Sequence, residues 1–278
     1  MPTWVEIVRS VQAASRTLFV EMQRADAELL KALEEGPRQA ADVLGLRTAQ
    51  LQEALRFGQQ QQASLGQVAV TLFVAAEEDV APSAQTMSLV LNHCFQPGFR
   101  EILTNSRHRD MPRKMLGSII RRSDGQAAYV AINVANQLNL PEGIEPAVKV
   151  LNNPPQPHMV PQALIMVTKS GDAAHLPAIE KLLENKTVIT RATEGNNKVT
   201  YELQVRDTAL ASAVLLSKQE LRSYFDPQVQ QITDIQQIIY NARLIGFPDE
   251  ETRTKAFDKW AKYKASLPQG NDAARPQP

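Results

Sequence analysis

The sequence has little of several residue types on which small secreted and metal-binding proteins depend. Its 278 residues include one cysteine, Cys94, so an intramolecular disulfide and a cysteine-based zinc cluster are both excluded. Glycine occurs only 12 times and aromatic residues make up 5%, whereas alanine, leucine and glutamine are plentiful. This balance favours helices over strands.

An excess of one charge and a long hydrophobic run are missing as well. The chain has 30 Lys and Arg against 30 Asp and Glu, so it is not drawn as a whole to nucleic acid or to an anionic membrane. The most apolar run, 68–76, is too short to cross a bilayer. Glu6, Arg9 and Arg16 interrupt the first residues, which excludes a signal peptide. We therefore expect a cytoplasmic protein with no membrane contact, unless a start upstream of Met1 adds an export signal.

The motifs of common catalytic sites do not occur. The sequence contains no phosphate-binding loop, no dinucleotide-binding Gly-x-Gly-x-x-Gly and no Gly-x-Ser-x-Gly elbow, and its four histidines do not form an i,i+4 pair. His93 and Cys94 are adjacent, but neighbouring residues on a helix point about 100° apart. Their apolar surroundings favour a buried structural cysteine. We expect no catalytic residue, no metal and no cofactor, and hence a protein that is not an enzyme.

Residues 3–35 are predicted to form one long helix that ends at Gly36-Pro37. Apolar or small residues recur in steps of four and three, which is the heptad spacing of helices that pack in pairs. This heptad seam consists of Trp4, Val8, Val11, Ser15, Leu18, Met22, Ala25, Leu29 and Ala32. Flanking apolar residues widen the stripe, which favours packing against the protein's own helices. Pairing with a second copy of the chain, a homodimer through this N-terminal helix, is the alternative.

After this helix the pattern predicts shorter elements. We expect a helix over 38–44, a break at Gly45, a second helix over 48–57 and an apolar helix over 65–76. The polar turn 77–83 then marks a boundary between the N-terminal helices and the main body.

From residue 84 onward a helix–turn–helix unit recurs along the chain. A shift of 32 residues aligns Ala131 with Ala163 and Leu151 with Leu183, and a third copy begins near Val205. Between the second and third copies, β-branched runs flank a Gly-Asn turn within 187–201. This pattern is typical of a β-hairpin, which we interpret as an insertion between repeat helices.

The segment 205–216, Val-Arg-Asp-Thr-Ala-Leu-Ala-Ser-Ala-Val-Leu-Leu, resembles the first helix of a HEAT repeat. It has an Arg near the helix start, small residues for tight helix contacts and long aliphatic residues between them. Segment 161–183 resembles the same two-helix unit, and 84–265 as a whole is similar to uncharacterised bacterial HEAT-like repeat proteins that end in a Gly-Phe-Pro-Asp-type helix. The resemblance implies a binding scaffold, since such solenoids offer long concave surfaces.

The expected fold is therefore all-α. N-terminal helices within 1–76, with a long-helix hairpin, would precede an α-solenoid of HEAT-like helix pairs over 84–265. The β-hairpin insertion lies near 187–201, and a disordered tail follows over 266–278. The expected function is that of a non-enzymatic scaffold for protein–protein interaction, with another protein as partner.

A second resemblance points to a different function. Segment 39–58 resembles a bacterial helix-turn-helix, with Ala41 and Leu51 at family-like spacing around the turn residue Gly45. The resemblance implies nucleic-acid binding as the alternative function. The second helix offers Gln50 and Gln52 to bases but few cations to phosphates, which makes nucleic acid an improbable partner. An αα-turn that only packs against its neighbours is the competing interpretation.

The basic segment 107–122 is the one unusual charge feature. We name as candidate residues for an anionic partner Arg107, Arg109, Arg113, Lys114, Arg121 and Arg122. Lys114 and Arg121 are two helical turns apart and so share a face. The segment either binds phosphates or an acidic partner, or it is a solvated face that pairs with the acidic turn at 77–79.

Overall fold

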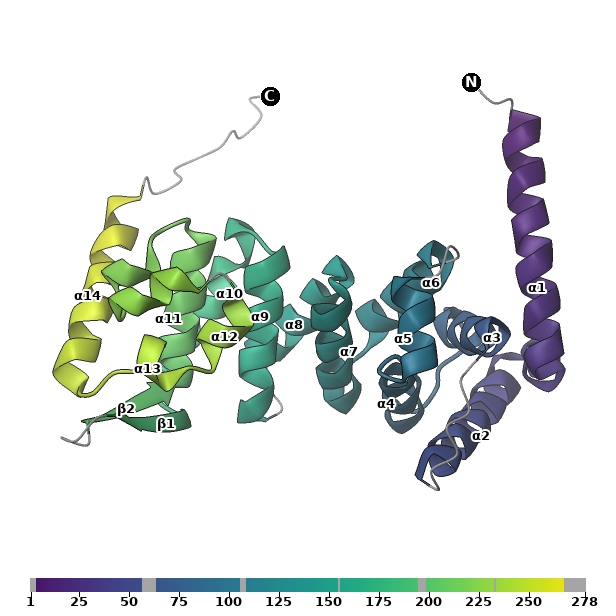
Figure 1. Cartoon of the computed structure of the whole chain (residues 1–278), viewed down its shortest axis with the longest axis horizontal. Helices are drawn as coiled ribbons and strands as arrows, with labels where there is room; N and C mark the ends of the chain where they lie inside the picture. The colour runs from purple at the N-terminus through teal and green to yellow at the C-terminus, as the bar shows by residue number, and fades with distance from the viewer. Residues whose placement is uncertain are drawn as a thin grey trace, which may run out of the picture. The chain divides into compact units, whose positions relative to one another are not determined.

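The computed structural model describes residues 4–56, 64–105, 109–154, 156–194, 199–232 and 234–267. Over these residues the protein is mostly helical and contains a two-stranded antiparallel sheet (Figure 1). The chain divides into two compact units, 1–150 and 151–278. The polar turn 77–83, at which we expected a boundary, lies inside the first unit. None of the described helices is both long and apolar enough to cross a membrane.

The first unit is built from helices joined by short connections. They are α1 (Trp4–Glu35), α2 (Pro37–Arg56), α3 (Leu65–Ala76), α4 (Ala84–His93), α5 (Pro97–Thr104), α6 (Asp110–Arg122), α7 (Gly125–Leu138) and the 3-10 turn η1 (Pro141–Gly143), followed by α8 (Ile144–Asn152) at the division between the units. These bounds confirm the predicted apolar helix over 65–76 and the predicted break at Gly36-Pro37.

Helices of the first unit pack in successive pairs. Helix α1 packs against α3 while α2 packs against α4, and in the same way α3 packs against α6 while α4 packs against α7 (Figure 1). The apolar faces of α3, α6 and α7 are buried in this arrangement. Helices before the turn 77–83 pack against helices after it, so the turn lies within one unit.

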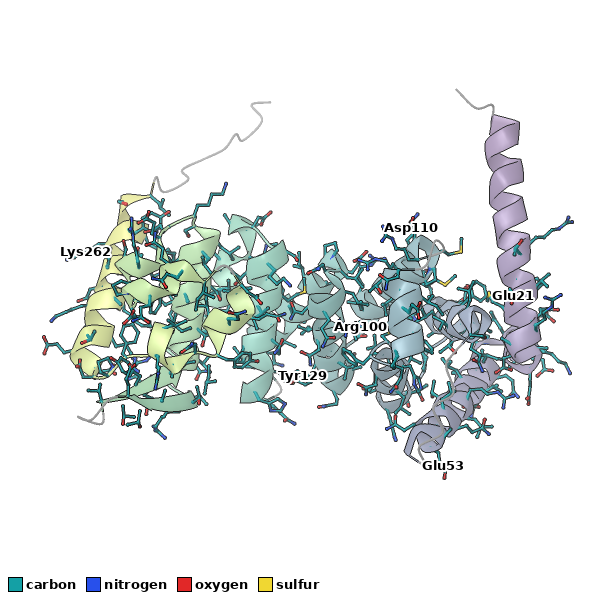
Figure 2. The ribbon with its side chains drawn as sticks, in the orientation of Figure 1. Glu21, Glu53, Arg100, Asp110, Tyr129 and Lys262 are labelled. Carbon is teal, nitrogen blue, oxygen red and sulfur yellow. The ribbon has the colours of Figure 1, made fainter. Side chains whose placement is uncertain are left out.

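Two helices of this unit approach each other closely where α1 crosses the start of α3. A Cβ atom on Gly66 would lie 2.3 Å from the backbone carbonyl oxygen of Glu21 and 2.9 Å from the Cβ of Ala25. Figure 2 shows Glu21 on α1 at the level of α3. Only glycine permits this separation, because any side chain would force the two backbones apart.

The predicted break at Gly45 is wrong. Residues 37–56 form one continuous helix, α2, so the short helix over 38–44 and the second helix from 48 are parts of the same element. A Cβ on Gly45 would lie 3.3 Å from Oγ1 of Thr86 on α4. The glycine therefore serves the close contact between α2 and α4, whereas the sequence pattern had indicated a turn.

The second unit holds shorter helices and the sheet. They are η2 (Pro157–Met159), α9 (Val160–Ser170), η3 (Ala173–His175), α10 (Leu176–Glu180), β1 (Val188–Glu194), β2 (Val199–Gln204), α11 (Val205–Leu216), η4 (Leu221–Ser223), η5 (Pro227–Gln231), α12 (Ile235–Ile239), α13 (Ala242–Ile245) and α14 (Glu250–Ser266). Helix α11 is the core of this unit: every residue from Val205 to Val214 is buried, and α9, α10, α13 and α14 contact it.

The sheet confirms the predicted hairpin. Strands β1 and β2 are antiparallel, with Arg191 opposite Glu202 and Thr193 opposite Thr200. The four residues between the strands lie outside the described residues. Backbone hydrogen bonds between Glu202 and Phe247, 3.0 and 3.1 Å long, attach the hairpin to the segment that precedes α14.

Asp234 and Asn241 each cap a helix start through a side-chain oxygen, which gives the two short helices α12 and α13. Helix α10 ends at Glu180, and the chain continues from there as a turn. Of the predicted tail 266–278, residues 268–278 lie outside the described residues, and Ser266 is the last residue of α14.

The predicted repeat can be examined position by position. Ala131 on α7 and Ala163 on α9 are both fully buried, as are Ile132 and Leu164 beside them. Further along the two copies diverge, since α8 has nine residues and α10 has five. The aligned alanines are thus both core residues, each of its own unit.

A buried ionic cluster joins α11 to α14 in the second unit. Arg253 donates from Nε to Oδ1 of Asp207 at 3.0 Å and from NH1 to Oε2 of Glu250 at 2.6 Å. Arg206 also binds Glu250, through NH2 at 2.7 and 2.8 Å. The guanidinium of Arg253 lies 5.3 Å from the ring centroid of Phe247. Burial raises the pKa of Asp207 to about 6, although Gln204 and Arg253 act in the opposite direction.

Candidate functional site

Three arginines of the basic segment, Arg109, Arg113 and Arg122, bind helix ends within the first unit. Arg113 donates to the carbonyl oxygens of Leu103 at 3.3 Å and Leu138 at 2.8 Å. Arg122 donates to the carbonyl oxygens of Ala75 and, at 2.7 Å, Glu77. Carbonyls at a helix C-terminus have no partner within the helix and carry partial negative charge, so a guanidinium there stabilises the fold. These three guanidinium groups are engaged by the protein itself.

The charged side chains of the segment do not converge on one point. Arg109 donates from NH1 to the carbonyl oxygen of Thr104 at 3.1 Å and forms an ion pair with Asp110 at 3.7 Å, and Arg121 forms one with Glu142 at 3.7 Å. Lys114 is exposed. Figure 2 shows Asp110 at the start of α6. Arg107 lies outside the described residues. The binding of an anionic partner by this segment stays a prediction, now resting on Lys114 and Arg121.

The described part of segment 39–58, on which the nucleic-acid alternative depends, does not form a helix-turn-helix. Residues 39–56 lie in the single helix α2, so no second helix is set at an angle for insertion into a DNA groove, and Phe57 and Gly58 lie outside the described residues. Charge reversal at Arg113 or Arg122 would remove contacts to helix ends and so weaken the fold. Such variants are therefore unsuitable as probes of nucleic-acid binding.

The adjacent His93 and Cys94 are both buried in the first unit, as the sequence pattern indicates for the cysteine. Burial raises the pKa of the Cys94 thiol to about 12, so the thiolate needed for nucleophilic attack is scarce at neutral pH. Burial also lowers the pKa of His93, whose ring lies against Phe99 with 5.8 Å between the centroids. Among the described residues, no group of three His, Cys, Asp or Glu side chains is placed to hold a metal ion.

A kink in α1 marks a different candidate site, and it corrects the prediction of one uninterrupted helix over 3–35. Asp26 has extended dihedral angles, φ −158° and ψ 82°, inside α1. Its Oδ1 accepts a hydrogen bond from the backbone N–H of Leu29 at 3.0 Å. Both features are those of an N-cap residue, so a new helical segment begins after Asp26.

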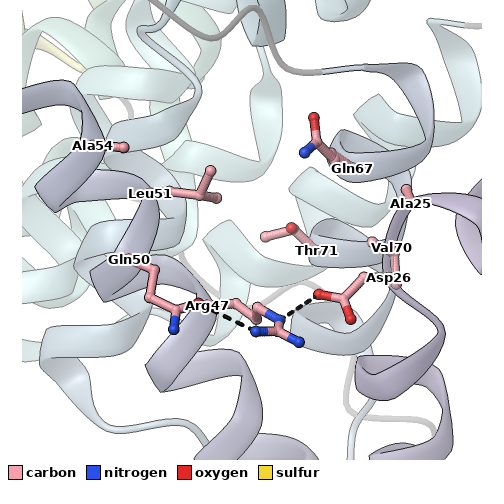
Figure 3. Close-up of a pocket in the computed structure, with 9 residues that line it drawn as sticks. All are labelled: Ala25, Asp26, Arg47, Gln50, Leu51, Ala54, Gln67, Val70 and Thr71. Carbon is pink, nitrogen blue, oxygen red and sulfur yellow. Dashed lines mark hydrogen bonds and ion pairs between the residues drawn. The ribbon is translucent and has the colours of Figure 1, made fainter. Parts of the chain in front are cut away.

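Arg47 on α2 ties this kink to the neighbouring helix. Its Nε donates to Oδ2 of Asp26 at 2.8 Å, and NH1 donates to Oε1 of Gln50 at 3.2 Å (Figure 3). Its NH2 donates to Glu28. The hydrogen bond to Asp26 raises the pKa of the Arg47 guanidinium. Two carboxylates therefore neutralise this cation, and it is not free to bind a further anion.

A hollow of about 300 Å³ lies beside the kink, between α1, α2 and α3 (Figure 3). Helix α2 contributes four residues at the spacing of one helical face, and α3 contributes three residues at the same kind of spacing. The lining consists of Ala25 and Asp26 from α1, Arg47, Gln50, Leu51 and Ala54 from α2, and Gln67, Val70 and Thr71 from α3. Apolar walls and polar groups thus meet in one concave site, the combination typical of binding pockets.

The sequence carried partial signals for this pocket. An aspartate before Glu28 and Leu29 is a common helix start, and it could have divided the heptad seam at Asp26. Gln50 and Leu51 drew attention only as parts of the supposed recognition helix. The convergence of α1, α2 and α3 could not be found, because residues of the pocket lie more than forty positions apart, as Asp26 and Val70 do.

No protein-family model, no curated protein and no solved structure matches this chain in the comparisons we made.

Proposed function

We propose that this protein is a non-enzymatic scaffold of HEAT-like helix pairs that binds another protein through the pocket beside Asp26 and Arg47. The arrangement of the first unit supports the scaffold: α1 packs on α3 and α2 on α4, then α3 on α6 and α4 on α7. Stacking of corresponding helices in successive pairs is the arrangement by which solenoid repeats bury the faces that one pair alone would expose.

The pocket has the size and lining for one large side chain of a partner. A volume of about 300 Å³ is at the lower limit for small-molecule sites and suits a single aromatic anchor residue. Leu51, Ala54 and Val70 offer apolar contact, while Gln50 and Thr71 offer polar groups. A tyrosine or tryptophan fits this lining best, because each combines a large apolar ring with one polar hydrogen-bonding group.

The observation that carries the proposal is the pairing of Arg47 with Asp26 and Glu28 at the edge of the pocket. A free guanidinium would favour a phosphate or carboxylate ligand, whereas a neutralised one leaves shape and hydrogen bonding to decide what binds. This favours a neutral aromatic anchor over a nucleotide or an acidic metabolite.

A displayed peptide library, selected against the full chain, tests the proposal. We expect the selected peptides to share a Tyr or Trp at one position. Ala54→Trp fills the pocket and should weaken their binding at least about tenfold, or about 1.4 kcal/mol. Ala49→Trp is the matched control, since Ala49 is exposed on α2 and does not line the pocket.

Equal affinity of the peptides for the two tryptophan variants would refute the pocket as the binding site. Selected peptides without a shared aromatic residue would refute the anchor. Circular dichroism and urea unfolding of both variants identify any loss of binding that is caused by unfolding.

A further inference from the structure

The pocket between α1, α2 and α3 has two glutamine amides in its lining, and the oxygen of each is already engaged. Oε1 of Gln67 accepts the backbone N–H of Ser64 at 2.9 Å, as part of the capping box at the start of α3. Oε1 of Gln50 accepts from NH1 of Arg47 at 3.2 Å. A guanidinium and a backbone N–H can only donate, so these contacts fix which end of each amide is the oxygen.

The amide nitrogens are therefore the ends that remain for a ligand. Within the described part of the chain, neither Nε2 atom has a protein acceptor within hydrogen-bond distance. Gln67 is half-buried, and Figure 3 shows it across the hollow from Leu51, whereas Gln50 is exposed. A donor partly withdrawn from water makes a stronger hydrogen bond to a ligand than one that water surrounds. Gln67 is thus the stronger of the two amide donors.

The carboxylate of the lining is engaged by the protein itself. Oδ1 of Asp26 accepts from the backbone N–H of Leu29 at 3.0 Å, and Oδ2 accepts from Nε of Arg47 at 2.8 Å. The hydroxyl of Thr71 can donate or accept, so it does not favour either kind of ligand. The lining therefore offers amide donors more readily than acceptors, and a group that enters the pocket needs an acceptor of its own.

The charges at the edge of the pocket decide which kind of acceptor fits. Arg47 pairs with two carboxylates, those of Asp26 and Glu28, so this cluster carries an excess of negative charge. A phosphate or carboxylate brought beside it would be repelled. The acceptor that suits the pocket is therefore a neutral oxygen.

We propose that the anchor side chain of the partner is a tyrosine, and that Gln67 selects it by donating from Nε2 to the phenol oxygen. This inference rests on the proposed function, which does not distinguish tyrosine from tryptophan. A phenol oxygen accepts as well as donates, whereas the indole N–H of tryptophan only donates and would meet the Gln67 amide donor to donor. A phenylalanine anchor would cover Nε2 of Gln67 without giving it a partner.

Gln67→Glu removes the donor and retains the helix start. Glutamate serves as well as glutamine at the third position of a capping box, so its carboxylate still accepts the N–H of Ser64. Gln50→Glu is the matched control, because it makes the same chemical change and adds the same charge at the exposed amide, where the oxygen still accepts from Arg47. Circular dichroism and urea unfolding of both variants identify any loss of binding that is caused by unfolding.

NMR titration of the full chain with side-chain analogues tests the inference. The compound para-methylanisole carries an acceptor oxygen and no donor, skatole carries an indole N–H donor and no acceptor, and toluene carries neither. Relative to toluene, Gln67→Glu should weaken the binding of para-methylanisole about three- to tenfold, the range of one hydrogen bond, and should strengthen that of skatole. Gln50→Glu should change each affinity by less than about twofold, because its amide is exposed. In the wild-type protein, the side-chain N–H signals of Gln67 should shift more with para-methylanisole than with toluene.

The outcomes separate this inference from the proposed function. If Gln67→Glu weakens para-methylanisole and toluene equally, the selection by Gln67 is overturned while the aromatic anchor stands. The same follows if Gln50→Glu weakens para-methylanisole as much as Gln67→Glu does, since the added charge would then account for the loss. If none of the three compounds binds to the wild-type protein, the pocket takes no aromatic ring, and both proposals fail.

Discussion

Within the part of the chain that the structure describes, two Asp–Arg pairs join helices, and they differ in their access to water. The side chains of Asp207 and Arg253 are 0% and 5% exposed, whereas those of Asp26 and Arg47 are 15% and 30% exposed. Each aspartate also accepts a backbone N–H near a helix start, from Gln204 in one case and from Leu29 in the other. The same chemistry is thus used in a core and at the edge of a pocket.

The difference in burial separates a structural role from a binding role. Around Arg253 the remaining donors are satisfied by Glu250 and by the carbonyl of Glu202, and the ring of Phe247 covers the guanidinium. Beside Arg47 a hollow remains open. Ion pairs enclosed on every side contribute to folding alone, whereas a pair at a hollow can also shape what enters it.

The largest effect is expected at the buried pair. Arg253→Met leaves the carboxylate of Asp207 without its partner in the core of the second unit, and it should lower the free energy of unfolding by about 3–5 kcal/mol. Urea unfolding monitored by circular dichroism measures the loss. A change below about 1 kcal/mol would mean that the pair is no more structural than a surface ion pair.

The pH dependence of stability tests the same carboxyl group. Folding raises the pKa of Asp207 to about 6, above the value of about 4 for an unfolded aspartate. The folded state therefore retains the proton longer, and the contribution of Asp207 is complete below pH 4 and is lost as the pH rises through 6. We expect the free energy of unfolding of the wild-type protein to fall by up to about 3 kcal/mol over this window, and that of Asp207→Asn to lack this fall. The slope of the free energy of unfolding against pH, compared between the two proteins, measures the difference. Equal slopes would contradict it.

A smaller effect is expected at the partly exposed pair. Asp26→Ala removes a helix cap, worth about 1 kcal/mol, and an ion pair of about 0–1 kcal/mol. The predicted loss in urea unfolding is thus about 1–2 kcal/mol. If Asp26→Ala destabilises the protein as much as Arg253→Met does, the distinction between the two pairs fails.

The smallest effect is expected at a pair on the hairpin whose arginine is largely exposed. Arg191 binds Glu202 at 2.6 Å, but its side chain is 60% exposed. Arg191→Met should change the free energy of unfolding by at most about 1 kcal/mol, because water replaces the lost partner. This variant is also the matched control for Arg253→Met, and a larger loss would show that the hairpin stabilises the second unit more than its exposure indicates.

Local patterns predicted the elements better than the contacts. The apolar helix over 65–76 and the hairpin near 187–201 are present because their residues prefer those structures wherever the chain places them. The turn at Gly45 was wrong because glycine also serves close helix contacts, and only the position of Thr86 distinguishes the two uses. The kink at Asp26 was missed because the heptad spacing on both sides of it is regular.

In the basic segment 107–122, too, the sequence indicates a feature but not its contacts. Its charge is visible in the sequence, but Arg113 and Arg122 bind carbonyl oxygens at the ends of other helices. No pattern within 107–122 marks these two as different from Lys114 or Arg121, since a backbone carbonyl carries no sequence signature.

The sequence by itself determined the helical character, the hairpin and the apolar faces, because periodicity and intrinsic propensity act between near neighbours along the chain. Tertiary structure alone decided which arginines are occupied, which glycine is a helix contact and where a pocket opens. Each of these depends on groups such as Asp26 and Arg47, or Asp207 and Arg253, that only packing brings within hydrogen-bond distance.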